Sequence, residues 1–232
     1  MAGAGTAPPL VTDVDGTLTD DELRLDPRMG PALRAWDGPV VLATGKVLPF
    51  PIALANYLGL ERTVIAENGG VTFVEATDDL RVHGDREAAQ AVADAYVEAG
   101  YDLGWGVADL PNRWRETEVI AARDRPLEPL RDLAAEHGLE VVDTQYAYHV
   151  KSPTMTKGKG LETVADALGY EPTEFVAVGD STNDVSTFER AGTAIAVANA
   201  DDAALAAADH VTDDTFADGF LEALDRVDAG EW

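Results

Sequence analysis

The chain has 232 residues and 46% hydrophobic residues, so it can bury the core of one or two domains and is not typical of a disordered protein. Its 43 acidic and 17 basic residues give a net charge of −26, which disfavours binding to bare nucleic acid or to an anionic membrane. No apolar run approaches the roughly 20 residues of a membrane helix, and the opening residues lack the pattern of a secretory signal. Without cysteine there is no disulfide or thiolate metal site, and we expect a cytoplasmic protein.

The acidic residues are spread along the whole chain rather than gathered in a tail. We interpret them as a solvated, halophilic surface, because in about 1 M salt the Debye length falls to about 3 Å and self-repulsion is screened. A role in cation storage is the alternative. Three of the four lysines, Lys151, Lys157 and Lys159, lie within nine positions. Because cations are disfavoured at a helix start, this cluster predicts an anion-binding role.

Short apolar runs alternate with helical patterns in the first and last thirds of the chain. The predicted strands are residues 10–13, 40–44, 64–66, 175–179, 194–198 and 210–211. The predicted helices are residues 28–36, 48–58, 159–168, 185–190, 201–208 and 219–224. Continuous apolar strands that alternate with helices predict an α/β fold with a doubly wound, Rossmann-like parallel sheet.

The middle of the chain breaks this rhythm. The patterns there predict, in order, a helix at 85–99, strands at 101–107 and 117–122, a helix at 127–137, and strands at 139–144 and 146–151. This order suits a small antiparallel sheet with helices on one face, which is a separate α+β lobe. We therefore expect a core formed by residues 1–77 and 152–232, with a lobe at residues 78–151 inserted into it.

Asp13 and Asp15 carry the strongest chemical signal. They stand at the end of the first apolar run, within Asp-Val-Asp-Gly-Thr-Leu-Thr, and open α/β sheets hold their ligands at that end of their strands. A carboxylate such as that of Asp13 can attack phosphorus and form an aspartyl-phosphate. The carboxyl group of Asp15 can protonate the leaving oxygen and later deprotonate water, if the chain bends at Gly16.

A second acidic turn, residues 179–184, follows a later apolar run and contains Asp180 and Asp184. Two carboxylates about 4 Å apart repel each other by about 4 kcal/mol at an effective dielectric constant of 20. A divalent cation relieves this repulsion, and hard oxygen ligands favour Mg²⁺. We expect Mg²⁺ to be held by Asp13, the backbone carbonyl of Asp15, Asp180 and Asp184. Zinc is disfavoured, because the histidines show no ligand spacing.

Two weaker motifs offer donors to a phosphoryl group. Thr44 and Gly45 follow the second predicted strand and bring a hydroxyl and backbone amides to the same sheet edge, and Lys157 offers a fixed positive charge before a helix. Taken singly, each motif is equally a strand-end turn or a helix entry, and the Glu-Asn-Gly-Gly run at 67–70 reads as a simple turn. Their order along the chain favours the joint site.

Together these motifs resemble those of the haloacid dehalogenase superfamily of phosphatases, over nearly the whole chain. The insert is similar to the α/β cap of the Cof-type branch in its smallest form. The resemblance implies a nucleophile at Asp13 and a general acid/base at Asp15. It implies Mg²⁺ at Asp13, Asp15, Asp180 and Asp184, and substrate binding by Thr44, Gly45, Lys157 and Asn183. Lys46 departs from the pattern, since relatives often carry Arg, Asn or another polar residue there.

Within that branch the compact insert most resembles archaeal phosphatases of 2-phosphoglycolate. This implies a small-molecule phosphate ester as the partner, with no nucleic acid or membrane, and a monomer or homodimer. Two alternatives stay open: the same chemistry on a sugar phosphate or in a phosphomutase of the same fold, and a non-catalytic acidic module that binds cations.

Phosphoglycolate carries a carboxylate beside its phosphate, so a cation from the insert is expected to bind it. Arg113 and Arg115 are the candidates, because arginine suits bidentate contact with carboxylates. Pairing of these arginines with neighbouring glutamates in a surface loop is an equally good interpretation. For Tyr146, Tyr148 and His149, on the last predicted strand of the insert, we expect packing roles.

Overall fold

The computed structural model describes residues 7–144 and 146–232. Its larger part is a sheet with the strand order β11-β10-β9-β1-β2-β3-β4-β5. The strands of this sheet are β1 (Leu10–Asp13), β2 (Val40–Ala43), β3 (Thr63–Ala66), β4 (Val71–Val74), β5 (Asp79–Val82), β9 (Val176–Gly179), β10 (Thr193–Ala196) and β11 (His210–Val211). All neighbours from β11 to β3 run parallel, and β4 and β5 are antiparallel additions.

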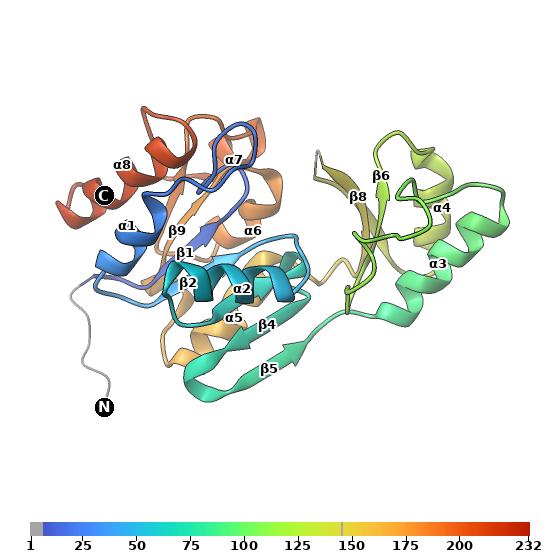
Figure 1. Cartoon of the computed structure of the whole chain (residues 1–232), viewed down its shortest axis with the longest axis horizontal. Coiled ribbons are helices and arrows are strands. Elements are labelled where there is room, and N and C mark those ends of the chain that lie inside the picture. The colour runs from blue at the N-terminus through green and yellow to red at the C-terminus, as the bar shows by residue number, and fades with distance from the viewer. Residues whose placement is uncertain (1–6, 145) are drawn as a thin grey trace.

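Helices cover both faces of this sheet (Figure 1). On one face lie α1 (Met29–Ala35), α2 (Pro49–Leu58) and α8 (Phe216–Asp228), and on the other lie α5 (Lys157–Leu168), α6 (Val185–Phe188) and α7 (Asp202–Ala207). Short 3₁₀ turns are η1 (Glu67–Gly69), η2 (Glu75–Thr77), η3 (Pro172–Glu174) and η4 (Thr182–Asp184). The central strands are buried on both faces, which explains their continuous apolar sequence.

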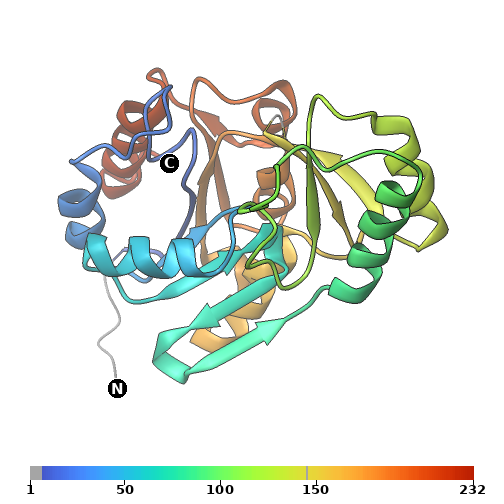
Figure 2. The ribbon, with the colours of Figure 1, turned by 45° about the vertical axis from the view of Figure 1, so that its right-hand side comes forward.

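A second, three-stranded sheet has the order β6-β8-β7 and is antiparallel throughout. It consists of β6 (Val119–Ala122), β7 (Glu140–Asp143) and β8 (Ala147–Lys151), with α3 (Arg86–Glu98) and α4 (Leu127–Glu136) packed on one face. Figures 1 and 2 show this lobe, in green and yellow, at one side of the larger body. The predicted α/β fold with a small α+β insert is confirmed.

One predicted strand is absent for reasons of turn chemistry. Residues 101–107 form no strand, because Gly104 and Gly106 adopt left-handed backbone angles of +84° and +68° and Asp102 accepts a hydrogen bond from the Gly104 amide at 2.7 Å. Conversely, β4 and β5 were not predicted. Residues 79–82, which the sequence places in the insert, form β5 and pair with β4 of the large sheet.

In the part of the chain that the structure describes, none of the helices is both long and apolar enough to cross a membrane.

Candidate active site

Three neighbouring strands bring the predicted motifs to one edge of the sheet. β1 lies between β2 and β9, and all three run parallel, so their carboxyl ends meet. Asp13 is the last residue of β1, Thr44 follows β2, and Asp180 follows β9. The sequence therefore places these residues together by topology alone.

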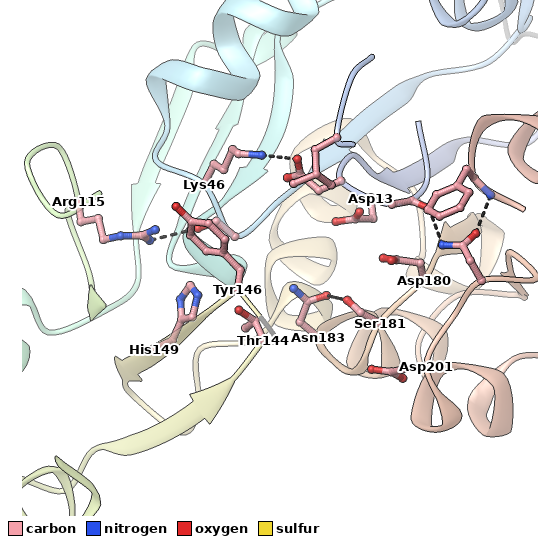
Figure 3. Close-up of a pocket in the computed structure, with 16 residues that line it drawn as sticks. Asp13, Lys46, Arg115, Thr144, Tyr146, His149, Asp180, Ser181, Asn183 and Asp201 are labelled. Carbon is pink, nitrogen blue, oxygen red and sulfur yellow. Dashed lines mark hydrogen bonds and ion pairs between the residues drawn. The ribbon is translucent and has the colours of Figure 1, made fainter. Parts of the chain in front are cut away.

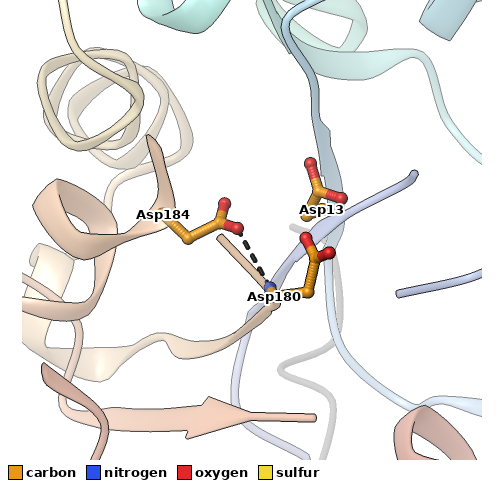
Figure 4. Close-up of side chains that lie close together, drawn as sticks. All are labelled: Asp13, Asp180 and Asp184. Carbon is orange, nitrogen blue, oxygen red and sulfur yellow. Dashed lines mark hydrogen bonds between the residues drawn. The ribbon is translucent and has the colours of Figure 1, made fainter. Parts of the chain in front are cut away.

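Asp13, Asp180 and Asp184 form a carboxylate cluster (Figure 4). One oxygen of each side chain lies within 4.8 Å of those of the other two. The second oxygen of Asp184 is fixed in the η4 turn, where it accepts hydrogen bonds from the backbone amides of Asp180 at 3.1 Å and Ser181 at 3.2 Å. The turn thus aims a nearly buried carboxylate at the end of β1.

Lys157 is the cation of this cluster. Its side chain is fully buried, and its ammonium donates to Asp13 at 2.6 Å and to Asp184 at 2.8 Å. It is the first residue of α5, whose amino-terminal end is capped by the Thr156 hydroxyl, which accepts from the Lys159 amide at 3.1 Å. The cap fixes where the helix begins and so where the lysine stands.

The cluster holds more negative than positive charge. Three carboxylates and one ammonium leave an excess of two negative charges when all four groups are ionised. Burial raises the pKa of Asp13 to about 7, against the lowering influence of Lys157. Burial, together with the charges of Asp13 and Asp184, raises the pKa of Asp180 to about 8. A divalent cation would balance the two excess charges.

Two oxygen atoms of the cluster are ready to bind such a cation. Oδ2 of Asp13 and Oδ1 of Asp180 are buried and have no hydrogen-bond partner among the described residues. Buried acceptors without partners are costly, and a cation ligated by oxygen would satisfy both. The donor set contains only oxygen, which suits Mg²⁺. Asp13, Asp180 and Asp184 therefore fit the predicted site.

The turn after β1 requires glycine at position 16. Gly16 has a φ of +86°, and a Cβ atom there would stand 2.2 Å from Oδ2 of Asp180. Its carbonyl accepts a hydrogen bond from Nδ2 of Asn199 at 2.9 Å, and Oδ1 of Asn199 in turn accepts from the Phe216 amide at 2.6 Å. Close approach of this turn to Asp180 is thus possible only without a side chain.

Asp15 lies beside the cluster and lines the cavity between the core and the inserted lobe. Its carboxylate pairs with Lys46, whose ammonium also lies 4.6 Å from the ring centre of Phe50. Lys46, noted in the sequence as a departure from the family pattern, is therefore the partner of the predicted acid/base residue.

Thr44, Gly45 and Asn183 occupy the loops around the cluster. The buried Thr44 hydroxyl accepts from the Lys46 amide at 3.1 Å, and the Gly45 carbonyl accepts from Arg115 at 3.1 Å. Asn183 donates from Nδ2 to Asn68 at 3.2 Å and lines the cavity. Thr44 and Lys157 do not line the cavity, because both are fully buried and bonded within the protein.

The cavity itself has a volume of about 630 Å³ and lies between the core and the lobe (Figure 3). From the core it is lined by Asp13, Asp15, Gly45, Lys46, Asp180 and Asn183, among others. From the lobe it is lined by Arg115, Thr144, Tyr146 and His149. The packing roles that we predicted for Tyr146 and His149 are therefore incomplete, whereas Tyr148 packs in the core of the lobe. Arg113 is exposed and does not line it.

The predicted lysine cluster does not form one anion site. Lys151 bonds to Glu140 at 2.7 Å and to the Met155 carbonyl at 2.6 Å, and Lys159 bonds to Glu162 at 2.6 Å on the surface. Of the three lysines, only Lys157 bonds to the cluster of Asp13, Asp180 and Asp184. Proximity in sequence misled the prediction.

The Glu-Asn-Gly-Gly run, predicted as a simple turn, joins core and lobe. Glu67, Asn68 and Gly69 all adopt positive φ angles, of 49°, 53° and 94°. The fully buried carboxylate of Glu67 accepts hydrogen bonds from the amides of Glu116 and Thr117 and from the Thr117 hydroxyl, at 2.6 to 3.1 Å. The sequence signal that could have revealed this contact between core and lobe is a charged residue, followed by asparagine and glycine, directly after a buried strand.

A model of the family described as haloacid dehalogenase-like hydrolase matches residues 10–99 and 131–224. The chain belongs to this family of hydrolases, as the sequence motifs indicated.

Curated relatives of this chain carry the name phosphoglycolate phosphatase. The protein of Haloarcula marismortui is 60% identical over 217 residues, which are 94% of this chain and 96% of the relative. The protein of Natronomonas pharaonis is 58% identical over 219 residues, which are 94% of this chain and 97% of the relative.

Solved structures share the fold. A crystal structure from Thermoplasma acidophilum matches with a TM-score of 0.83 and 24% identity, over 96% of this chain and 98% of that one. A haloacid dehalogenase-like hydrolase from Bacteroides thetaiotaomicron matches with a TM-score of 0.77 and 20% identity, over 96% of this chain and 100% of that one.

Proposed function

We propose that the chain is a Mg²⁺-dependent phosphatase that hydrolyses 2-phosphoglycolate to glycolate and phosphate through an aspartyl-phosphate. The chain is a phosphoric monoester hydrolase. The observation that carries the proposal is the buried cluster at the end of β1, where Lys157 joins carboxylates that need a further divalent charge. The names of the relatives at 60% and 58% identity support the choice of substrate.

The proposed chemistry has two steps. A carboxylate oxygen of Asp13 forms a bond to phosphorus while the bond from phosphorus to the ester oxygen breaks, and Asp15 gives its proton to that oxygen. Asp15 then takes a proton from water, whose oxygen forms a bond to phosphorus while the bond from phosphorus to the Asp13 oxygen breaks, which releases inorganic phosphate and restores the Asp13 carboxylate. Each proton taken from Asp15 is returned, so the cycle balances.

The surrounding residues prepare these steps. Lys157 holds Asp13 by an ion pair of 2.6 Å and keeps a positive charge beside the phosphoryl position. Lys46 pairs with Asp15 and restrains it at the cavity wall. Bound Mg²⁺ would supply electrostatic stabilisation of the phosphoryl oxygens and would neutralise the excess charge of Asp13, Asp180 and Asp184.

The inserted lobe supplies the second wall of the cavity. We propose that this cap begins after β5, because Asp79–Val82 pairs within the large sheet, and that it ends with β8 at Lys151. Closure of such a lobe over the site would exclude water from the first step.

The test is phosphate release from a panel of esters in molar KCl, with 2-phosphoglycolate beside sugar phosphates, in Mg²⁺ or in EDTA. We expect turnover that needs Mg²⁺ and a kcat/KM at least tenfold higher for 2-phosphoglycolate. The control is Asp13→Asn, which keeps the size of the side chain and removes the nucleophile. Mg²⁺-dependent turnover that survives in Asp13→Asn would refute the covalent mechanism. Transfer of phosphate between esters without its release would identify a phosphomutase.

A further inference from the structure

The two walls of the cavity differ in charge. The core wall carries the carboxylates of Asp13, Asp15, Asp180 and Asp201 with the single ammonium of Lys46, whereas the lobe wall carries Arg115 and His149 (Figure 3). Phosphate chemistry as proposed uses only the core wall. The basic groups of the lobe wall are left without a role in that chemistry.

Arg115 is held rigidly at the junction of lobe and core. Its side chain is only 4% exposed. Nε donates to the Pro111 carbonyl at 2.9 Å, and Nη1 donates to the Gly45 carbonyl at 3.1 Å and to Glu118. A guanidinium has five donors, so these bonds leave both hydrogens of Nη2, which have no acceptor among the described residues. Because Nη1 bonds to the Gly45 carbonyl, the guanidinium lies against the loop that follows β2.

His149 reaches the cavity because of strand alternation. On β8 the side chains of Tyr148 and Val150 face the helices of the lobe, so His149 points to the opposite face, toward the core. Nδ1 lies 3.0 Å from both carboxylate oxygens of Glu118. Within the described chain Nε2 has no hydrogen-bond partner, although the side chain is only 3% exposed and lines the cavity.

Glu118 connects the two basic groups and orients both. It is fully buried, and burial alone would raise its pKa, but the charges of His149 and Arg115 outweigh burial and lower it. The ionised carboxylate therefore accepts from Arg115 Nη1 and from His149 Nδ1–H. In the imidazolium form, whose charge lowers the Glu118 pKa, both ring nitrogens carry a proton: Nδ1–H donates to Glu118, and Nε2–H is left as a donor on the cavity side.

We propose that Arg115 Nη2 and His149 Nε2 form a subsite for the carboxylate of the substrate, with Glu118 as a positioning residue. The inference rests on the proposed function, since it concerns the end of the substrate that does not react. Two buried side chains with free nitrogen atoms on one cavity wall match the two oxygens of a carboxylate. The phosphate end faces Asp13 and the carboxylate end faces the lobe.

The neighbouring Arg113 provides a matched control. It lies in the same loop two residues away, is exposed, and lies 5.9 Å from the Trp114 ring, outside the cavity. The substitutions Arg115→Lys and Arg113→Lys both keep the charge and remove the guanidinium. Only the first removes a donor from the proposed subsite.

The experiment compares kcat/KM for 2-phosphoglycolate and for ethyl phosphate, which replaces the carboxylate by a methyl group. We expect Arg115→Lys, His149→Gln and Glu118→Gln each to lower the ratio of the two values at least tenfold, chiefly through KM for 2-phosphoglycolate. Arg113→Lys should leave the ratio within twofold. A merely structural role would lower both values together, and an unchanged ratio in these variants would overturn the subsite.

A measurement on the unaltered protein tests the subsite even if a variant fails to fold. 2-Carboxyethylphosphonate should inhibit competitively at least tenfold more tightly than propylphosphonate, which lacks the carboxylate. Equal inhibition by the two phosphonates, with phosphate esters hydrolysed, would overturn the subsite and leave the phosphatase standing. Failure to hydrolyse any phosphate ester would overturn the proposed function itself.

Discussion

Replacement of Lys157 by methionine tests the charge balance of the carboxylate cluster. Lys157 is fully buried and bonded to two carboxylates, at 2.6 and 2.8 Å, so its removal leaves them without their cation. Breaking a buried ion pair by removing one partner costs about 3–5 kcal/mol of unfolding free energy. We expect a loss of this size for Lys157→Met at pH 8.5 in EDTA.

The loss should depend on pH in a defined direction. In the metal-free protein the pKa of Asp13 is about 7 and that of Asp180 about 8, both raised above the ordinary value of 3.8. Carboxyl groups with raised pKa values bind protons more tightly in the folded state than in the unfolded state. The stabilisation of the fold by this proton binding is therefore complete below pH 3.8 and is lost as the pH rises through 7 and 8. Lys157 opposes both shifts. At pH 6 the cost of removing it should therefore be smaller by at least about 1.4 kcal/mol, the equivalent of one pKa unit.

The assay is urea unfolding followed by tryptophan fluorescence in molar KCl with EDTA, at pH 6 and pH 8.5. The control is Lys159→Met, because among the described residues Lys159 forms an ion pair only with Glu162 and its side chain is 54% exposed, so the change should stay below about 1 kcal/mol. A Lys157→Met loss that is equal at both pH values, or no larger than that of the control, would refute the reasoning.

Three further predictions follow from other features. Gly16→Ala should lower kcat/KM at least tenfold, because its Cβ would stand 2.2 Å from Asp180; Gly100→Ala, which also changes a positive φ but meets nothing within 4 Å, should leave activity unchanged. Calorimetric titration should show Mg²⁺ affinity rising from pH 6 to pH 8.5, since Mg²⁺ competes with protons on Asp13 and Asp180; a flat profile would contradict their pKa values of about 7 and 8. Thermal melts should show a Tm that rises with KCl toward molar concentrations, because salt screens the net charge of −26, and a constant Tm would exclude this.

The sequence predicted the parts of the molecule that depend on buried strands. Asp13, Thr44 and Asp180 follow or end apolar runs, and parallel pairing of those runs brings them together without any further information. The assignment of their catalytic roles stays a proposal. The strand predicted at residues 101–107 was wrong. The segment has apolar members, but Gly104 and Gly106 adopt positive φ angles and form turns instead of a strand.

The remainder of the site depends on contacts between distant segments. Glu67 reads as an exposed turn residue until the lobe brings the amides of residues 116 and 117 against it. His149 reads as a packing residue until strand alternation shows which face of β8 it occupies. The two interpretations of Arg115 were not exclusive, because it pairs with Glu118 and lines the cavity at once.

The bonds of Glu67 limit how the lobe can swing relative to the core. A rotation that pulled residues 116 and 117 away would leave the buried carboxylate of Glu67 without its hydrogen-bond donors. Any rotation of the lobe therefore has to pivot at the contact between Glu67 and residues 116 and 117. Thr144 and Tyr146, between β7 and β8, line the cavity from the lobe. A motion of the lobe that preserved the bonds of Glu67 would change the distance of these two residues from the core wall more than that of residues 116 and 117, which are fixed to Glu67.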